Sequence, residues 1–183
     1  MVINKKTYKL KDGRTLVIRC PLNKDAETLV STYRKACGES RNLSRGPDDF
    51  NITNMQERML IKCINESERQ IMLAAFVDGE HAGNADIAKA SALFRDRHRC
   101  TLGIMLLNQF TGLGIGTILI TELSNIAKSL GYEQIELEVI KDNIGAIRLY
   151  EKLGFIKTGI TPRGKKYSDN TYADVLNMVK FID

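Results

Sequence analysis

The stretch Gln109-Phe110-Thr111-Gly112-Leu113-Gly114-Ile115-Gly116-Thr117 carries three glycines at every second position. An apolar run from Leu102 to Leu107 precedes it. Apolar side chains then recur at the i, i+3, i+4 spacing of a helix, at Ile115, Ile118, Leu119, Leu123, Ile126, Ala127 and Leu130. Gly131 follows at the position of a left-handed helix stop. The pattern predicts a strand, a glycine loop and the start of a helix.

Such a helix start binds anions. Its first N–H groups have no internal acceptor, and the aligned peptide dipoles place partial positive charge there. Glycine lets an anion approach the backbone closely. The sequence therefore predicts a phosphate site between Thr111 and Thr117.

Two common phosphate loops do not fit this stretch. The nucleotide-triphosphatase loop G-x-x-x-x-G-K-[ST] requires a lysine, and none follows these glycines. The dinucleotide fingerprint G-x-G-x-x-G requires a third small residue, but counting from Gly112 finds Thr117 and counting from Gly114 finds Leu119. A dinucleotide fold would also need several more βα units than the remaining chain provides.

The residues from Leu102 onward instead resemble the GCN5-related N-acetyltransferases, or GNAT superfamily, whose cofactor loop reads [Q/R]-x-x-G-x-[G/A]. Two registers are open. The register that begins at Gln109 matches the motif letter by letter. The register that begins at Thr111 has threonine in place of Gln or Arg, but it matches the wider family pattern G-x-G-I-G-T/S, and we prefer it.

A second stretch resembles the family's other signature, N-x-x-A-x-x-L-Y-x-x-x-G-F. The matching residues are Asn143, Ala146, Leu149, Tyr150, Gly154 and Phe155. Either motif alone is weak, but both occur in order and at the usual separation. Together they cover roughly a third of the chain.

This resemblance implies an α/β (mixed α+β) fold, with a central mixed, mostly antiparallel sheet flanked by helices on both faces. It implies one domain over residues 1–183 that moves an acetyl group from acetyl-CoA to a primary amine by direct attack in a ternary complex. A non-catalytic acetyl-CoA-binding regulatory module with the same fold is the alternative. A nucleotide-binding protein is a third reading, and stabilisation by NAD or ATP would reveal it.

The resemblance also implies the site residues. Tyr150 is the implied catalytic acid, which protonates coenzyme A as it leaves, although its spacing alone favours core packing. A backbone N–H near Leu106 is implied to face the thioester carbonyl. The implied cofactor-binding residues are Met105, Leu106, Leu107, Thr111, Gly112, Leu113, Gly114, Ile115, Gly116, Thr117, Asn143 and Lys152. Asn143 is equally suited to capping a helix.

The general base and the acceptor amine are less well defined. Asp86 is the nearest candidate base on a central strand, although a turn or surface position fits it equally well, and His98 reads as part of a solvated turn. By the resemblance, the loops at Ser40–Asn51 and Pro162–Asn170 line the acceptor groove. Acidic residues in the first loop, Asp48 and Asp49, favour a cationic acceptor, and the basic residues of the second favour an acidic one. A small-molecule or peptide amine is expected.

The composition limits the cellular setting. The chain has 183 residues, 43% hydrophobic and 27% charged, which is typical of one globular domain. No apolar run approaches the roughly 20 residues that span a bilayer, and the lysine-rich N-terminus lacks a signal peptide's apolar segment. We expect a cytoplasmic protein without a membrane or nucleic-acid partner, because the net charge of +5 is dispersed. A homodimer is left open.

The cysteines are scattered without a C-x-x-C pair, so we expect reduced thiols and no metal site.

Strands are predicted at Arg14–Cys20, Gln70–Val77, Glu80–Ser91, Cys100–Leu107, Gln134–Ile140, Phe155–Thr158 and Tyr172–Phe181. Three helices are predicted besides the one after the glycine loop. The first covers Asp25–Cys37 and is ended by Gly38, the second begins after a Thr53 cap, and the third covers Asn143–Leu153. Asp78-Gly79 predicts a hairpin. The helix after Thr53 is expected to turn Met55, Met59, Leu60, Cys63 and Ile64 inward.

Overall fold

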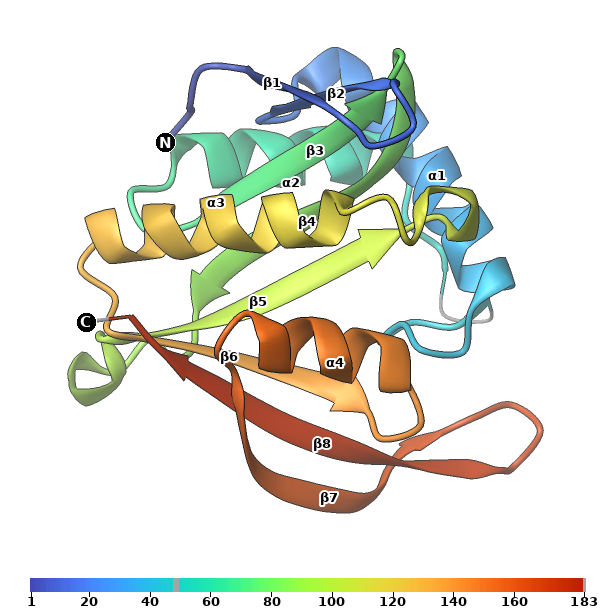
Figure 1. Ribbon diagram of the computed structural model, residues 1–183, viewed down its shortest axis with the longest axis vertical. Coiled ribbons are helices and arrows are strands. Elements are labelled where there is room, and N and C mark those ends of the chain that lie inside the picture. The colour runs from blue at the N-terminus through green and yellow to red at the C-terminus, as the bar shows by residue number, and fades with distance from the viewer. Residues whose placement is uncertain (48–49, 183) are drawn as a thin grey trace.

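The computed structural model describes residues 1–47 and 50–182 (Figure 1). Its strands are β1 (Lys6–Lys9), β2 (Thr15–Arg19), β3 (Ile71–Val77), β4 (Glu80–Lys89), β5 (Arg99–Leu106), β6 (Gln134–Ile140), β7 (Ile156–Lys166) and β8 (Tyr172–Phe181). Its α-helices are α1 (Ala26–Glu39), α2 (Asn54–Glu66), α3 (Ile115–Ser129) and α4 (Ile144–Lys152).

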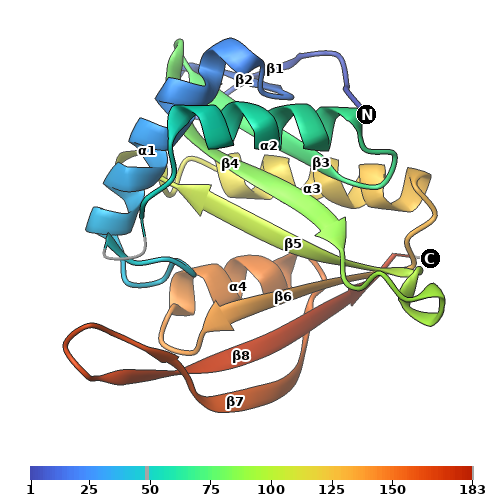
Figure 2. The same cartoon turned by 180° about the vertical axis from the view of Figure 1, so that it is seen from behind.

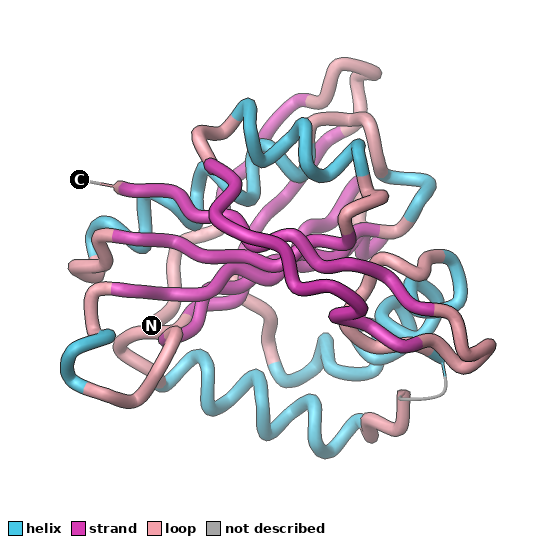
Figure 3. Tube along the Cα trace, turned by 90° about the horizontal axis from the view of Figure 1, so that it is seen from below, coloured by secondary structure: helices cyan, strands magenta, loops and turns pink. Residues whose placement is uncertain are grey.

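The described strands form one sheet in the order β1-β2-β3-β4-β5-β6-β8-β7. Every neighbouring pair is antiparallel except β5 and β6, which run parallel. Helices α3 and α4 cover one face (Figure 1), and α1 and α2 cover the other (Figure 2). Figure 3 shows the sheet nearly edge-on between these helices. The predicted fold class is confirmed.

The helix after the glycine loop forms as its spacing predicts. Its inward stripe is Ile115, Leu119, Ile120, Leu123 and Ala127, each at most 1% exposed. These side chains join the main hydrophobic core with the strands beneath them. Burying such branched side chains contributes roughly 1.5–3 kcal/mol each, so this stripe fixes the helix on the sheet and thereby fixes where its N-terminus opens.

The hairpin between β3 and β4 turns at the predicted residues. Asp78 and Gly79 both have positive φ angles, 47° and 90°, as a two-residue turn of this kind requires. The carboxylate of Asp78 also accepts a hydrogen bond from the Thr15 amide at 2.9 Å. This hairpin aligns β4, the strand that carries Asp86.

Three elements differ from the prediction for clear physical reasons. Strand β1 was not predicted, because its four residues, Lys6–Lys9, are mostly polar and lie at the sheet edge, where charge is common. Strand β7 continues to Lys166 through the predicted loop, since an edge strand tolerates Pro162 and a bulge. Helix α1 passes Gly38 and ends at Glu39, because the φ angle of Gly38 is not positive.

The inward face of α2 also differs from the prediction. Ile64 is buried as expected, but Met55 and Met59 are 71% and 64% exposed, and Leu60 and Cys63 are also exposed. The helix instead buries Glu57, Ile61 and Ile64. Its sequence contains two apolar stripes, and contacts with α1 and β3 select the second.

A bulge in β4 shapes the centre of the sheet. The β3–β4 register shifts between Ala75 and Phe76, and Gly83 on β4 has a φ angle of 148°. A Cβ atom at Gly83 would lie 2.1 Å from the backbone oxygen of Met105. Only glycine permits this close approach of β4 to β5, and sequence patterning gave no sign of it.

Candidate active site

The parallel strands β5 and β6 separate after a short contact. They pair only from Arg99 to Thr101 with Gln134 to Glu136. A cleft of about 1380 Å³ lies along this opening, and its wall includes residues of β5, β6, the glycine loop and α4. Because the cleft follows the gap between these two strands, side chains from both faces of the sheet line it.

The backbone of β5 presents unused N–H groups to the opening. The Leu107 amide donates to the Ala82 oxygen on β4 at 2.9 Å. Because successive amides of a strand point to opposite edges, those of Ile104 and Leu106 point toward β6, beyond the last β5–β6 pair. The Leu106 N–H therefore has the orientation that the predicted carbonyl contact requires.

The glycine loop leads directly into α3. Gly112 and Gly114 have φ angles of 75° and 84°, and the helix's first hydrogen bond runs from the Ile118 amide to the Gly114 oxygen at 3.1 Å. Within the described part of the chain, the amides from 112 to 117 have no acceptor. This end of the helix is therefore free to hold an anion.

The structure favours one of the two motif registers. The Gln109 side chain donates to the Glu80 carboxylate at 2.6 Å and does not line the cleft, whereas Thr111 does. A Cβ atom at Gly116 would lie 3.1 Å from the Leu149 side chain, so a small residue is needed where α3 meets α4. Both observations favour the register that begins at Thr111.

Helix α4 brings two predicted residues to the cleft. Asn143 caps the helix, its side chain accepting from the Ala146 amide at 3.3 Å, and it also lines the cleft. Tyr150 is 7% exposed and packs against Phe155 with ring centroids 5.7 Å apart. Burial raises the pKa of Tyr150 to about 12, which keeps the phenol protonated at neutral pH.

Asp86 lies on the central strand β4 and lines the cleft. Among the described residues, its carboxyl group has no hydrogen-bond partner. Burial raises the pKa of Asp86 from 3.8 to about 6, because the charged form is poorly solvated. A turn or surface position, the other option open from sequence, is not what the structure shows.

Tyr33 lies on α1 and is not among the predicted site residues. It is half-buried, lines the cleft and stacks on Phe50 with centroids 5.4 Å apart. Burial raises the pKa of Tyr33, and the negative charges of Asp86 and Glu57 add to this shift. The phenol therefore lines the same cleft as the Asp86 carboxyl, which helical spacing alone could not reveal.

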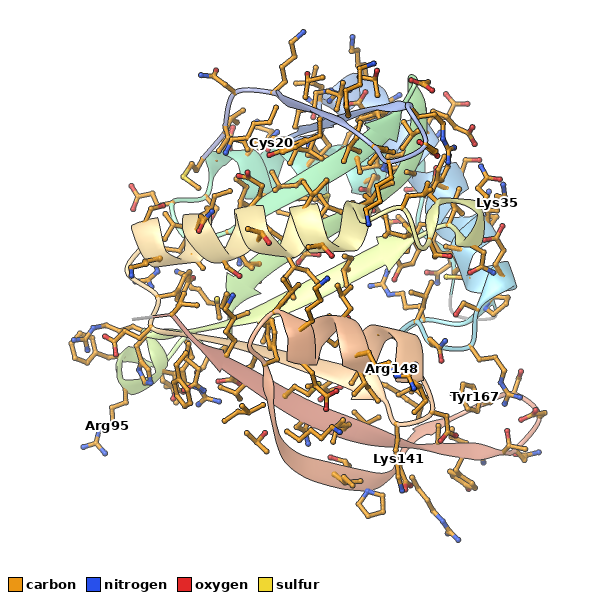
Figure 4. The ribbon with its side chains drawn as sticks, viewed as in Figure 1. Cys20, Lys35, Arg95, Lys141, Arg148 and Tyr167 are labelled. Atoms are coloured by element: carbon orange, nitrogen blue, oxygen red, sulfur yellow. The ribbon has the colours of Figure 1, made fainter. Side chains whose placement is uncertain are left out.

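The two loops expected at the acceptor side lie next to each other. Arg41 donates to the Thr171 hydroxyl at 2.6 Å and pairs with Asp169 at 3.1 Å. The Tyr167 hydroxyl donates to the Arg41 oxygen at 3.2 Å, and Figure 4 shows Tyr167 beside the end of the β7–β8 hairpin. Asp48 and Asp49, which were expected in the first loop, lie outside the described residues.

The predicted site residues do not all reach the cleft. Those that line it are Met105, Leu106, Thr111, Gly112, Gly114, Ile115, Gly116, Thr117, Asn143, Tyr150 and Lys152. Leu113 packs against the core, and Leu107 is 2% exposed with its amide already bonded to β4. Figure 4 shows Lys141 and Arg148 near α4, and neither lines the cleft.

The remaining chemistry of the described chain is limited. No group of three or more His, Cys, Asp or Glu side chains in residues 1–47 and 50–182 could hold a metal ion. Cys20, Cys37 and Cys100 are buried, and Cys63 is exposed. None of the described helices combines the length and apolar character of a bilayer-spanning segment.

A split sheet with free strand amides at the split, and a free helix N-terminus beside it, is the arrangement that the resemblance implies for an acyl-CoA-dependent transferase. Comparison with known proteins gives the family. Residues 31–155 match the model of the acetyltransferase (GNAT) family. The chain therefore belongs to this family, which confirms the predicted family and its type of chemistry, acetyl-CoA-dependent N-acyl transfer.

Individual relatives agree with this assignment. A GNAT-family acetyltransferase structure from Streptococcus pneumoniae is 30% identical, with a TM-score of 0.86 over 91% of this chain and 99% of that chain. The L-amino acid N-acetyltransferase AaaT of Escherichia coli (strain K12) is 31% identical over 59% of this chain and 66% of its own length. A yncA structure from Salmonella typhimurium, solved with acetyl-CoA, is 18% identical with a TM-score of 0.82 over 92% and 94%, and shows the same fold.

Proposed function

We propose that this protein transfers an acetyl group from acetyl-CoA to a primary amine by direct attack, without an acyl-enzyme. One observation carries the proposal: the gap between β5 and β6 brings the unpaired Leu106 amide, the open N-terminus of α3 and the unpartnered Asp86 carboxyl to one cleft. A cofactor-binding module with no chemistry has no need of a desolvated, unpartnered acid there.

The binding step uses backbone amides. The diphosphate of acetyl-CoA rests on the amides from 112 to 117, where the helix dipole favours negative charge. Asn143 and Lys152 also line the cleft. The pantetheine arm then follows the free edge of β5, so the thioester carbonyl accepts a hydrogen bond from the Leu106 N–H.

The chemical step needs a base and an acid. Asp86 accepts a proton from the acceptor ammonium, and the free amine forms a C–N bond to the acetyl carbon. The C–S bond breaks, the Tyr150 hydroxyl donates its proton to the leaving sulfur, and the second proton that the attacking nitrogen loses restores the Tyr150 hydroxyl. The Asp86 carboxyl is ionised above about pH 6, so turnover should rise as the pH passes through that value.

The test is coenzyme A release across a panel of amines that includes diamines, aminoglycosides, L-amino acids and peptides with free N-termini. AaaT is named for L-amino acids, which makes those the first acceptors to measure. We expect release with at least one class, and thermal stabilisation by acetyl-CoA but not by NAD or ATP. Stabilisation without release across the panel would favour the regulatory module, and stabilisation by NAD or ATP instead would favour a nucleotide-binding protein.

Replacing Tyr150 with phenylalanine should lower kcat about tenfold to a hundredfold, because general acid catalysis of thiolate departure is lost. The affinity for acetyl-CoA should stay within about twofold, since the ring still packs on Phe155. Steady-state kinetics and isothermal titration measure the two quantities. Tyr132→Phe is the control, because Tyr132 is buried but bonds the Arg69 oxygen away from the cleft. An unchanged kcat for Tyr150→Phe removes this residue from the mechanism.

A further inference from the structure

Gly103 occupies the middle of β5, where glycine normally weakens a strand. Its φ angle is not among the positive values of the described glycines, so the backbone conformation does not require glycine. The reason for glycine must therefore lie in the space that a side chain would fill.

That space holds the Asp86 carboxyl group. Gly103 pairs directly with Asp86 across β4 and β5. A Cβ atom at Gly103 would lie 3.0 Å from Asp86 Oδ1, 3.6 Å from Cγ and 3.7 Å from Oδ2. The distance to Oδ1 is tighter than an ordinary contact and the other two are ordinary van der Waals distances, so the carboxyl group lies against the glycine with Oδ1 nearest.

Little else fixes the direction of this carboxyl group. It has no hydrogen-bond partner among the described residues, and burial is what shifts its pKa. From α1, Tyr33 lines the same cleft, and the charge of Asp86 contributes to the raised pKa of its phenol. On the same face of β5, the Arg99 guanidinium is already engaged by Glu136 and Asp96. The Gly103 backbone lies directly beside the carboxyl group, so the space above it helps to set the pose of Asp86.

We propose that Gly103 is a positioning residue for the base: its missing side chain lets the Asp86 carboxylate lie across β5 and face the gap where the acceptor amine meets the acetyl group. This inference rests on the proposed function. A methyl group at position 103 pushes the carboxylate by a few tenths of an ångström and removes water from one side of it. Catalysis is sensitive to such displacements.

The test is Gly103→Ala. The strand should persist, because the three atoms nearest to the added methyl group all belong to the Asp86 side chain, which can shift. We expect kcat at pH 7 to fall about tenfold, with the KM for acetyl-CoA unchanged. The acidic limb of the pH–rate profile should move to higher pH because the carboxylate is less solvated, so that part of the loss is recovered above pH 8.

Two comparisons make the test decisive. Gly38→Ala is the matched control, since a Cβ there meets nothing within 4 Å, and it should behave as wild type. In an Asp86→Asn background, adding Gly103→Ala should cost less than about twofold, because the residue acts through the carboxylate.

The outcomes separate the two proposals. Three outcomes overturn the positioning role while leaving the base assignment intact. The first is a wild-type kcat and pH profile for Gly103→Ala, and the second is an acidic limb that stays in place or moves to lower pH. The third is an equal loss of kcat when Gly103→Ala is added in the Asp86→Asn background. If Asp86→Asn itself turns over at the wild-type rate, Asp86 is not the base and both proposals fail. Circular dichroism of each variant confirms that the fold is retained.

Discussion

Asp86→Asn should reduce kcat by about 10²–10⁴-fold at pH 7.5, because an amide cannot accept the acceptor's proton. The KM for acetyl-CoA should change little, since the side chain lies on the face of the sheet opposite α3 and α4. Steady-state coenzyme A release measures both parameters. The wild-type rate should fall as the pH drops below about 6, where the carboxyl group becomes protonated, and the residual rate of the variant should lack this limb.

The same substitution should raise the melting temperature. Burial places the pKa of Asp86 at about 6, above its ordinary 3.8, so folding favours the protonated form. Its contribution to stability is therefore greatest at low pH and is lost as the pH rises through about 6. Asparagine removes the cost of the buried charge at pH 7.5, and calorimetry there should show a higher Tm. At pH 4 the difference should largely vanish.

Glu133→Gln is the matched control, because Glu133 is exposed at the start of β6 and does not line this cleft. It should change neither kcat nor Tm. Full activity of Asp86→Asn would show that another group or bulk water takes the proton. A lower Tm at pH 7.5 would show that the carboxylate stabilises the fold through a contact other than those described.

Gly83→Ala should destabilise the protein by more than about 3 kcal/mol, a large part of the usual total. A Cβ atom at this position would lie 2.1 Å from the Met105 oxygen and 2.8 Å from the Leu106 Cα. These are backbone atoms, so no rotamer change relieves the contact and β4 must move away from β5. The urea unfolding midpoint measures the loss.

Gly13→Ala separates steric from conformational strain. Gly13 has a φ angle of 86°, but a Cβ there meets nothing within 4 Å. Its substitution should therefore cost only about 1 kcal/mol, from the left-handed conformation itself. Equal losses in the two variants would show that close approach to β5 is not what requires Gly83. Because Leu106 borders the cleft, any folded Gly83→Ala protein should also bind acetyl-CoA more weakly.

The sequence predicted the loop and helix residues that line the proposed cofactor half of the cleft. The glycine loop, the α3 stripe and the α4 motif are local patterns, and short-range backbone geometry determines what they form. The residues from Thr111 to Thr117 and the cap at Asn143 therefore needed no knowledge of distant contacts. The helix after Thr53 shows the limit, since its two apolar stripes are equally helical and only packing on α1 and β3 selects Ile61 over Met59.

The acceptor half depends on contacts between strands that are distant in sequence. In the sequence, Asp86 is one acidic residue among many. Its carboxyl group is buried because β4 pairs with β5 and places it over Gly103. The separation of β5 from β6 likewise follows from pairing that ends at Thr101. Local periodicity determined the elements and the glycine loop of this protein. Tertiary structure alone decided which carboxyl group is desolvated and which strand amides are left unpaired. The reason is that burial and strand register are properties of the assembled sheet.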